Sequence, residues 1–522
     1  MKANFKKILA FFLLLAVIIT SLSIGAAAAE TPMLPINVQE QRFVDSEGRE
    51  RIFHGINYVV DKYGGPENLD DAFFAEYAAR GFNSMRLGLY WVMLEPEPDQ
   101  FDWDYIAAID PVFKAAEKHG VYLMLELHQD LYGRGAAGYG GKGAPDWACL
   151  IDGAKLQKRQ YLVWAEGYFW GKGVHNAFDN FWNNTEAYGK GLQEHYAEIW
   201  AMLAERYGGS PALLGYNFFN EPHPGTDGGK VFRKLIWNLV KVMIRRPRDL
   251  GEIILSVIVR GERLQLLNFL DGDTMRQITS AGDELIRKFD VEKYTPFLEK
   301  MTNAVREKTD KGIIFMDNSY FSNLSIPYSV ELPRVNGEIE PNVAFAPHGY
   351  DLVVDTDMYD KPGDDRVLAI FKEHRRSQER LNVPVLVGEW GGGWYGTPFV
   401  EHCRVLTEFF DENGWSFAYY GDWRLRGHVL DFLVRPYPMA VNGTDVNYRY
   451  DHGEGVFTLS YTQGGGDAPT IIYLPWDMDV DADGMDIKIV PAGGNSYPDA
   501  RYVLLTGGAG TQIVTITLDK AP

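Results

Sequence analysis

The stretch Leu213-Leu214-Gly215-Tyr216-Asn217-Phe218-Phe219-Asn220-Glu221-Pro222 runs from apolar residues into a single charge. The run Leu213–Phe219 is typical of a buried strand. Pro222 cannot donate a hydrogen bond to a sheet ladder, so Glu221 is predicted to lie at the very end of the strand. A charge at this position is costly unless it is hydrogen-bonded or used in chemistry. The stretch therefore predicts a working carboxylate at the end of a buried strand.

Eight runs of this kind recur along the chain, and each ends in polar or charged residues. They are Ile52–Asn57, Phe82–Tyr90, Val121–Asp130, Leu213–Glu221, Ile313–Asn318, Val343–His348, Val383–Glu389 and Ser416–Asp422. Segments with helical spacing lie between them, such as Leu69–Arg80 and Tyr105–Lys118, and Gly120 fits a helix stop. Alternating strands and helices predict an α/β fold with a parallel sheet. Eight strands predict a (β/α)₈ TIM barrel, which carries its active site at the carboxyl ends of the strands.

The character of the sequence changes after about Gly427. Short runs rich in β-branched and aromatic residues follow, without helical periodicity, and they predict a small C-terminal antiparallel β-sandwich. These runs are Val456–Tyr461, Thr470–Leu474, Asp486–Val490, Tyr502–Leu505 and Gln512–Leu518. We expect Arg435-Pro436-Tyr437-Pro438 to dock this unit on the barrel. The predicted domains are the barrel over residues 40–428, with an insertion at about 223–311, and the sandwich over 429–522.

The first residues predict a secretory signal peptide over residues 1–29. Lysines stand near the start, an uninterrupted apolar run covers Ile8–Ile19, and small residues occupy Ala26–Ala29. The apolar run is shorter than the roughly 18 residues needed to span a bilayer, which disfavours a membrane anchor. We therefore expect a secreted, extracellular protein.

Composition narrows the possible functions. The 522 residues are 46% hydrophobic, which excludes a disordered chain. The 51 Lys and Arg against 71 Asp and Glu give a net charge of −20, so a nucleic-acid partner is not expected. Two cysteines exclude a disulfide scaffold and a zinc site built from cysteines. Cys149 and Cys403 either pair or stay buried and free, and the sequence leaves both open.

Glu221 and Glu389 are the predicted chemical pair. Glu389 ends the run Val385–Val387 much as Glu221 ends its own strand. Two carboxylates facing each other across the mouth of a barrel provide the acid and the nucleophile for glycoside hydrolysis, without a cofactor. A single glutamate is usually a solvated surface charge, but two at the ends of buried strands favour the catalytic interpretation.

Several neighbours are candidates for supporting roles, although each also has an ordinary structural explanation. Asn220 is placed to bond a sugar hydroxyl, or serves as a turn residue. His348 and Tyr350 are expected to hold and orient the nucleophile, or simply pack. Arg86 would supply a cation beside Glu389. Trp423 ends the eighth strand and would form a floor on which a sugar stacks.

Other familiar motifs are unsupported. Residues 133–138 match GxGxxG, but no helical pattern follows, so we interpret them as a loop. The sequence has no Gly-x-Ser-x-Gly elbow and no HExxH. A metal held by His128, His223 and His348 is disfavoured. We therefore predict no metal and no cofactor.

At these residues the chain resembles glycoside hydrolase family five, and more narrowly the endoglycoceramidase group within it. The resemblance covers about residues 45–522, and Asn220-Glu221-Pro222 alone indicates only the family or its clan. The motifs that carry it are His128-Gln129-Asp130-Leu131-Tyr132-Gly133, Gly143-Ala144-Pro145-Asp146-Trp147, Phe219-Asn220-Glu221-Pro222, Gly388-Glu389-Trp390-Gly391 and Arg435-Pro436-Tyr437-Pro438.

This resemblance implies a retaining enzyme that cleaves the β-linkage between oligosaccharide and ceramide in glycosphingolipids. It implies Glu221 as acid/base and Glu389 as nucleophile. It further implies substrate binding by His128, Asp130 and Asn220, with help from Lys62, Tyr350 and Trp423. Two alternatives stay open: a family-five endo-β-glucanase acting on polysaccharide, and a non-catalytic glycan- or lipid-binding surface protein.

The insertion carries a charge pattern opposite to that of the chain. Across residues 230–264, nine Lys and Arg stand against three Asp and Glu. An apolar stripe at helical spacing accompanies them, made of Phe232, Leu235, Ile236, Leu239, Val240 and Met243. One interpretation is peripheral contact with a membrane or micelle surface that holds the substrate. The other is an ordinary barrel helix packed on the core. We expect the protein to be a monomer.

Overall fold

The structure is a computed structural model, and it describes most of the chain. The described residues are 33–62, 64–161, 163–256, 260–261, 269–354, 356, 358, 361–391, 397–421, 429–493 and 497–518. Three features of the sequence analysis lie outside them: the predicted signal peptide at 1–29, Trp423, and Arg263, one of the nine cations counted over residues 230–264. In the part of the chain that is described, no helix is both long enough and apolar enough to cross a bilayer.

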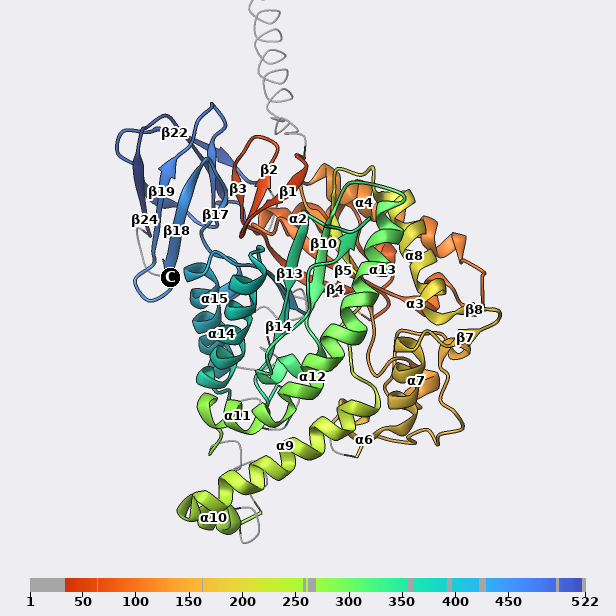
Figure 1. Cartoon of the computed structure of the whole chain (residues 1–522). Coiled ribbons are helices and arrows are strands. Elements are labelled where there is room, and N and C mark those ends of the chain that lie inside the picture. The colour runs from red at the N-terminus through yellow and green to blue at the C-terminus, as the bar shows by residue number, and fades with distance from the viewer. Residues whose placement is uncertain are drawn as a thin grey trace, which may run out of the picture. The chain divides into compact units, whose positions relative to one another are not determined.

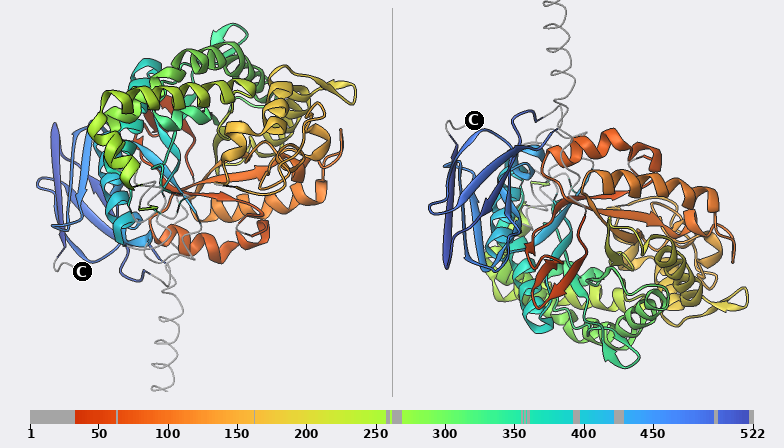
Figure 2. Two further views of the ribbon diagram at one scale, coloured as in Figure 1. Left: turned by 90° about the horizontal axis from the view of Figure 1, so that it is seen from below. Right: turned by 90° about the horizontal axis from the view of Figure 1, so that it is seen from above.

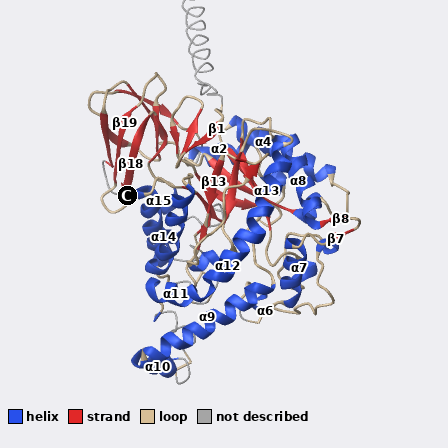
Figure 3. Ribbon diagram, viewed as in Figure 1, coloured by secondary structure: helices blue, strands red, loops and turns tan. Residues whose placement is uncertain are grey.

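The predicted parallel sheet is confirmed (Figures 1 and 3). Its segments lie in the order β13-β10-β9-β6-β5-β4-β16-β15-β14. Every residue of β5 and β6 is buried, as expected for strands covered on both faces. The bounds are β4 (His54–Val59), β5 (Ser84–Tyr90), β6 (Tyr122–His128), β9 (Leu213–Asn217), β10 (Ile313–Asp317), β13 (Val343–Ala346), β14 (His348–Gly349), β15 (Leu386–Trp390) and β16 (Ser416–Tyr420).

β13 and β14 are two halves of one strand, interrupted at Pro347, which has no N–H to give to the ladder. A parallel bridge between Phe345 and Val385 joins this strand to the start of the β15 segment. The eight predicted strands therefore close into a ring, and helices surround it (Figure 2).

The outer helices follow the predicted alternation with the strands. α4 begins where the Asp102 carboxylate accepts a hydrogen bond from Tyr105 N at 2.9 Å, and Gly120 takes a left-handed φ of 70° just after its end. The helices are α2 (Asp71–Ala79), α3 (Trp91–Leu94), α4 (Trp103–Lys118), α8 (Leu192–Tyr207), α13 (Thr295–Arg306), α14 (Asp364–Leu381), α15 (Thr397–Glu412) and α16 (Leu430–Leu433).

Two long connections stand at the carboxyl ends of the strands, where the site is expected. The first follows β6 and contains α5 (Arg134–Ala137), α6 (Glu166–Trp170), α7 (Lys172–Trp182) and the hairpin of β7 (Glu186–Ala187) and β8 (Lys190–Gly191). The second follows β9 and contains α9 (Thr226–Arg245), α10 (Pro247–Ile254), α11 (Gly272–Thr279) and α12 (Asp283–Phe289).

The C-terminal residues form antiparallel strands, as predicted. One sheet has the order β18-β19-β24-β21, and the other has the order β1-β2-β3-β17-β20-β23-β22. The N-terminal strands therefore extend a C-terminal sheet, and β3 pairs directly with β17. The domain boundaries 40–428 and 429–522 stay predictions. The strands are β1 (Ile36–Gln39), β2 (Arg42–Asp45), β3 (Glu50–Arg51), β17 (Tyr437–Val441), β18 (Gly443–Asp451), β19 (Val456–Gln463), β20 (Thr470–Leu474), β21 (Met478–Asp481), β22 (Asp486–Pro491), β23 (Arg501–Thr506) and β24 (Thr511–Leu518).

Arg435 and Tyr437 tie these sheets to the barrel. The buried Arg435 guanidinium donates two hydrogen bonds to the buried Asp411 carboxylate of α15, at 2.5 and 2.6 Å. The Tyr437 hydroxyl donates to the Gly81 carbonyl at 2.5 Å. Gly81 has a φ of 82°, and a Cβ there would meet the Tyr473 ring at 2.4 Å. Glycine is therefore required where the two parts touch.

Both cysteines are buried and free. This distinguishes between the two alternatives that the sequence left open, because Cys149 and Cys403 do not pair in the structure. Burial raises the pKa of the Cys149 thiol to about 12, so it is not a reactive thiolate at neutral pH.

Arg435→Ala should destabilise the protein strongly, because it leaves the Asp411 carboxylate buried without its cation. We expect a loss of about 3–5 kcal/mol in the free energy of unfolding, measured by urea denaturation. The exposed pair Lys288–Glu292 on one helical face provides the control. Lys288→Ala should cost less than about 0.5 kcal/mol. Equal losses for the two variants would contradict the proposed tie.

Candidate active site

Glu221 and Glu389 meet at the mouth of the barrel. Glu389 belongs to β15, and Glu221 follows β9 at the same end of the ring. A carboxylate oxygen of each lies within 4.8 Å of the other, and both side chains are almost fully buried. The structure thus brings together two carboxylates from strands far apart in the sequence.

Arg86 of β5 connects the polar groups beneath this pair. Its guanidinium is buried and donates to Glu389 Oε1 at 2.8 Å and to Asp317 Oδ2 at 3.2 Å. It also donates to the side-chain oxygens of Asn217, at 2.7 and 2.9 Å, and of Asn220, at 3.0 Å. Burial disfavours the charged arginine, but the surrounding carboxylates outweigh this effect and raise its pKa.

The Glu389 carboxylate is fixed by three donors on three different strands or strand ends. Oε1 accepts from Arg86 and, at 2.8 Å, from Asn57 Nδ2 of β4. Oε2 accepts from the Tyr350 hydroxyl at 3.1 Å. Three hydrogen bonds, one of them from a cation, hold this carboxylate in one position and orientation, as an attacking group requires.

Glu221 has different surroundings. Its Oε1 accepts from Asn323 Nδ2 at 2.6 Å and lies 3.1 Å from His348 Nδ1. Burial raises the pKa of Glu221 to about 7, although the bond from Asn323 opposes the shift. The residue also holds a φ of 42°, an uncommon conformation for a side chain with a Cβ. Glu221 can therefore hold a proton near neutral pH, as a general acid must.

His348 lies nearer to Glu221 than to the expected partner Glu389, whose Oε2 is 3.8 Å from His348 Nδ1. Its other ring nitrogen is 3.3 Å from Asp317 Oδ2. Burial lowers the pKa of His348 to about 3, even though the Glu389 carboxylate opposes the shift. The ring is thus neutral, and it adds no positive charge beside Glu221.

His128, at the end of β6, borders the other side of the carboxylate pair. Its Nδ1 lies 3.3 Å from Glu126 Oε2 and 4.0 Å from Glu389 Oε1, and its Nε2 lies 3.8 Å from Asp130 Oδ2. Burial disfavours protonation of His128, but these carboxylates outweigh it and raise the pKa. Its buried Nε2 has no hydrogen-bond partner among the described residues, so this nitrogen is available to a bound ligand.

Two of the motifs quoted from the sequence meet next to Asn220. Asn220 Nδ2 donates to the Gln129 carbonyl at 3.1 Å, and Gln129 Nε2 donates to the Asn220 carbonyl at 2.8 Å. Because Nδ2 uses one hydrogen for the Gln129 carbonyl, Asn220 keeps its second amide hydrogen for another acceptor, such as a sugar hydroxyl. Beside Gln129, the backbones of Asp130 and Lys142 exchange hydrogen bonds at 2.8 and 3.0 Å.

Lys62 is less closely placed than the other predicted residues that the structure describes. Lys62 donates to the Tyr420 hydroxyl at the end of β16, and the Tyr420 ring lies 6.4 Å from the rings of His128 and Tyr350. Lys62 is thus one side chain removed from the carboxylates. Trp423 lies outside the described residues.

Sequence reasoning missed several polar residues of the site. Asn57 and Asp317 end or nearly end predicted strands, so the pattern that marked Glu221 would have found them too. Glu126 lies within β6, Asn217 is the last residue of β9, and Asn323 lies on the short helical turn η7 (Tyr320–Leu324). No period or motif marks Asn323, because only the folded chain brings that turn to Glu221.

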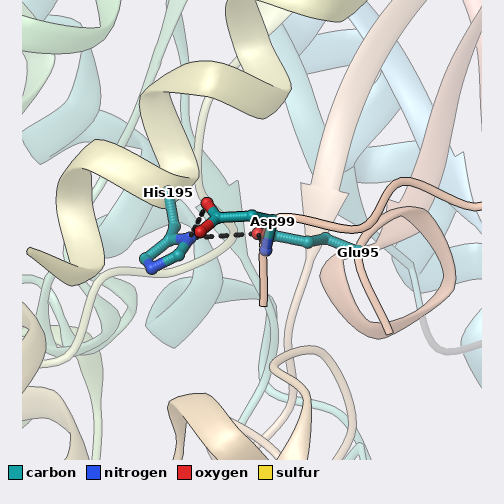
Figure 4. A group of neighbouring side chains, drawn as sticks. All are labelled: Glu95, Asp99 and His195. Carbon is teal, nitrogen blue, oxygen red and sulfur yellow. Dashed lines mark hydrogen bonds and ion pairs between the residues drawn. The ribbon is translucent and has the colours of Figure 1, made fainter. Parts of the chain in front are cut away.

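Two groups of side chains in the described residues have ligand atoms close enough for a metal. In the first, Glu221, His348 and Glu389, the Arg86 guanidinium already supplies a cation. The second contains Glu95, Asp99 and His195 (Figure 4).

The second group is held together by protein partners. Glu95 Oε1 accepts from Asp99 N at 2.9 Å and lies 3.0 Å from His195 Nδ1. Lys190 donates to Asp99 at 2.5 Å, so a cation is again present. Glu95 Oε2 also accepts from Trp91 Nε1 at 2.9 Å, which anchors the start of α3. We interpret this group as a structural tie between that segment and α8.

Comparison with known proteins agrees with this arrangement. The model of the cellulase family, glycosyl hydrolase family 5, matches residues 44–425, and the model of the glycoside hydrolase family 5 C-terminal domain matches residues 435–518. This chain belongs to glycosyl hydrolase family 5 and is a glycoside hydrolase.

Relatives with more specific names align over nearly the whole chain. Endoglycoceramidase I of Rhodococcus hoagii is 25% identical over 506 residues, which cover 94% of this chain and 89% of that protein. An endoglycoceramidase of Cyanea nozakii is 24% identical over 509 residues, covering 88% and 87%. The structure of endo-glycoceramidase II from Rhodococcus sp. in complex with ganglioside GM3 has a TM-score of 0.69 at 23% identity. The structural match covers 92% of this chain and 100% of that one, which shows that the two proteins share a fold.

Glu221→Gln should change how stability depends on pH. The pKa of Glu221 is about 7 in the folded protein against an ordinary 4.5, so the folded state binds this proton more tightly. Stability therefore falls as pH rises through this window. Above about pH 8, the neutral glutamine should make the variant more stable than the wild type by up to about 3 kcal/mol. Below about pH 4 the difference should vanish.

Urea denaturation at several pH values measures the effect. The control is the exposed Glu284, whose Glu284→Gln variant should show a much smaller change with pH than Glu221→Gln. A Glu221→Gln variant that is less stable than wild type at high pH would contradict the assignment of a raised pKa.

Proposed function

We propose that this chain is a retaining glycosidase that cleaves the β-glycosidic bond between the oligosaccharide and the ceramide of glycosphingolipids. The observation that carries the chemistry is the carboxylate pair within 4.8 Å, one member bonded to Arg86 and the other with a pKa of about 7. Separations of about 5 Å are typical of retaining glycosidases, whereas inverting enzymes leave room for a water. The names of the two relatives support the substrate class.

In the first step, a Glu389 oxygen forms a bond to the anomeric carbon while the bond to the ceramide oxygen breaks. Glu221 gives its proton to that oxygen, so ceramide leaves neutral. Positive charge develops on the sugar ring in this transition state. The hydrogen bonds from Arg86 and Asn57 to Oε1 keep the Glu389 carboxylate in position during this step.

In the second step, water attacks the anomeric carbon and Glu221, now ionised, accepts its proton. The bond to Glu389 breaks, which releases the oligosaccharide and returns both glutamates to their starting states. The neutral His348 ring and the Asn323 amide hold the Glu221 side chain in place, and neither group takes up its proton. We assign sugar binding to His128, Asp130, Asn220, Lys62, Tyr350 and Trp423.

A cluster of aromatic rings on the Glu221 side favours a lipid leaving group over a polysaccharide. Tyr320 stands on the same turn as Asn323, and its ring lies 4.3 Å from Tyr168 and 6.1 Å from Phe169. Phe169 in turn lies 4.7 Å from the Phe232 ring on α9. A chain of apolar rings that starts beside the Asn323 partner of Glu221 and reaches α9 suits ceramide. An endo-β-glucanase remains the alternative.

Incubation with a glycosphingolipid such as lactosylceramide, and separately with cellulose, tests the substrate class. We expect intact disaccharide and ceramide from the lipid, detected by mass spectrometry, and no products from cellulose. Soluble glucan fragments without lipid cleavage would instead favour the endo-β-glucanase. The Glu389→Gln variant serves as the inactive control. Binding of the lipid by the wild type without cleavage of either substrate would indicate a non-catalytic binding protein.

The two glutamates should fail differently on an aryl lactoside whose leaving group needs no protonation. Glu389→Ala should lose at least about 10³-fold in kcat. Glu221→Ala should still form the glycosyl-enzyme and release a burst of phenol, since only its acid role is bypassed. A burst from Glu389→Ala instead would reverse the assignment of the two glutamates.

With the wild-type enzyme and glycolipid, kcat/KM should fall as pH rises above about 7, when Glu221 loses its proton.

Export of the protein stays a prediction from residues 1–29. An extracellular location would suit a hydrolase that uses no cofactor and acts on lipids displayed at a membrane surface.

A further inference from the structure

Helix α9 is apolar on two opposite sides. One side is buried against α11 and the residues around η7, through Val231, Leu235 and Val242. The other side is exposed, although Ile236, Val240 and Ile244 repeat every four residues along it. The sequence offered core packing or surface contact as alternatives for this helix, and the structure contains both on different faces.

Trp237 is the most prominent member of the exposed side, with 68% of its surface accessible. Ile244 is 64% accessible, and Ile236, Val240 and Leu255 are each 40% or more accessible. Isolated apolar residues are common on protein surfaces, but a row along one helix face marks an interaction site. We name the four residues on α9, Ile236, Trp237, Val240 and Ile244, the apolar strip; the exposed Leu255 follows the end of α10.

A row of cations runs beside the strip. Lys234, Lys241 and Arg245 are spaced seven and four residues apart, so they share one line along α9, and Arg248 is a further cation on α10. All four are exposed, and among the described residues none has a carboxylate within ion-pair distance. The whole chain carries a net charge of −20, so these cations are concentrated against its overall charge.

This pairing of features selects the kind of partner. Exposed tryptophan and isoleucine beside lysine and arginine are typical of helices that lie in the headgroup region of anionic bilayers. A second copy of the chain would bring two cationic rows together, which disfavours self-association through this face.

The apolar surface continues from the strip towards the reacting groups. Phe232, one turn before Ile236, lies 5.8 Å from the ring of Trp170 on α6, and 43% of Trp170 is accessible. The aromatic cluster then leads through Phe169 and Tyr320 towards Glu221. Figure 1 shows α9 running from α6 outward to α10.

We propose that the apolar strip and its cationic row form a docking surface for an anionic lipid bilayer, placing the mouth of the barrel against the membrane. This inference rests on the proposed function for its purpose, because a glycosphingolipid must be reached at a bilayer. The docking itself needs no catalysis and can be measured apart from it.

The test uses the full chain with Glu221→Gln, so that no lipid is consumed. Vesicles of phosphatidylcholine, with or without phosphatidylserine and free of glycolipid, are sedimented with the protein. We expect binding to the anionic vesicles that weakens with added salt. Trp237→Ser with Ile244→Ser, and separately Lys241→Ala with Arg245→Ala, should each reduce binding about tenfold or more.

Matched controls come from α4, on another part of the barrel. Trp103 is exposed to 56%, and Lys114 is also exposed, so Trp103→Ser and Lys114→Ala should bind vesicles like the parent. No vesicle binding, equal loss in the controls, or unchanged binding in the strip variants would overturn the proposal. Equal binding to vesicles without phosphatidylserine would overturn its anionic component.

A second measurement separates this proposal from the proposed function. With Glu221 intact, the strip variants should lose about tenfold in kcat/KM on glycolipid in anionic vesicles and keep wild-type activity on a soluble aryl lactoside. If glycolipid is cleaved equally by all variants, the docking surface is wrong and the function stands. If vesicles are bound but glycolipid is not cleaved, the function is wrong and the docking surface stands.

Discussion

The buried guanidinium of Arg86 is the interaction on which the site depends. It stands among the carboxylates of Glu389, Asp317 and Glu126, of which Glu126 is 3.5 Å away. A buried cation shared among several carboxylates does not offset the cost of burial equally for all of them. Burial raises the pKa of Asp317 well above its usual range, although Arg86 opposes the shift.

This arrangement gives two chemically identical glutamates different properties. Glu389 touches the cation directly, whereas Glu221 faces the neutral ring of His348 and the Asn323 amide. Glu389 is fixed by a direct bond from a cation, and Glu221 keeps a proton near neutral pH. The division of labour in glycoside hydrolysis requires this difference. The difference between the two glutamates depends on which strand ends meet in the folded barrel, since the sequence next to each glutamate does not produce it.

The long connections after β6 and β9 add a second property to the same end of the barrel. The first brings aromatic rings next to Glu221, and the second extends these with α9. A ring of strands needs only short connections to close, so these segments are extra to the fold. Their exposed apolar and cationic residues carry no benefit for the folded protein alone, which is why we connect them with a lipid partner.

The sequence by itself determined the eight barrel strands, the antiparallel C-terminal strands and the two glutamates, because a buried strand ending in a charge is a local pattern. It could not determine that Asn323 reaches Glu221, or that β1–β3 extend the sheet of β17. It also left open which face of α9 is buried, since periodicity shows a stripe without its neighbour. These features depend on contacts between segments far apart in the chain, and only the tertiary structure decided them.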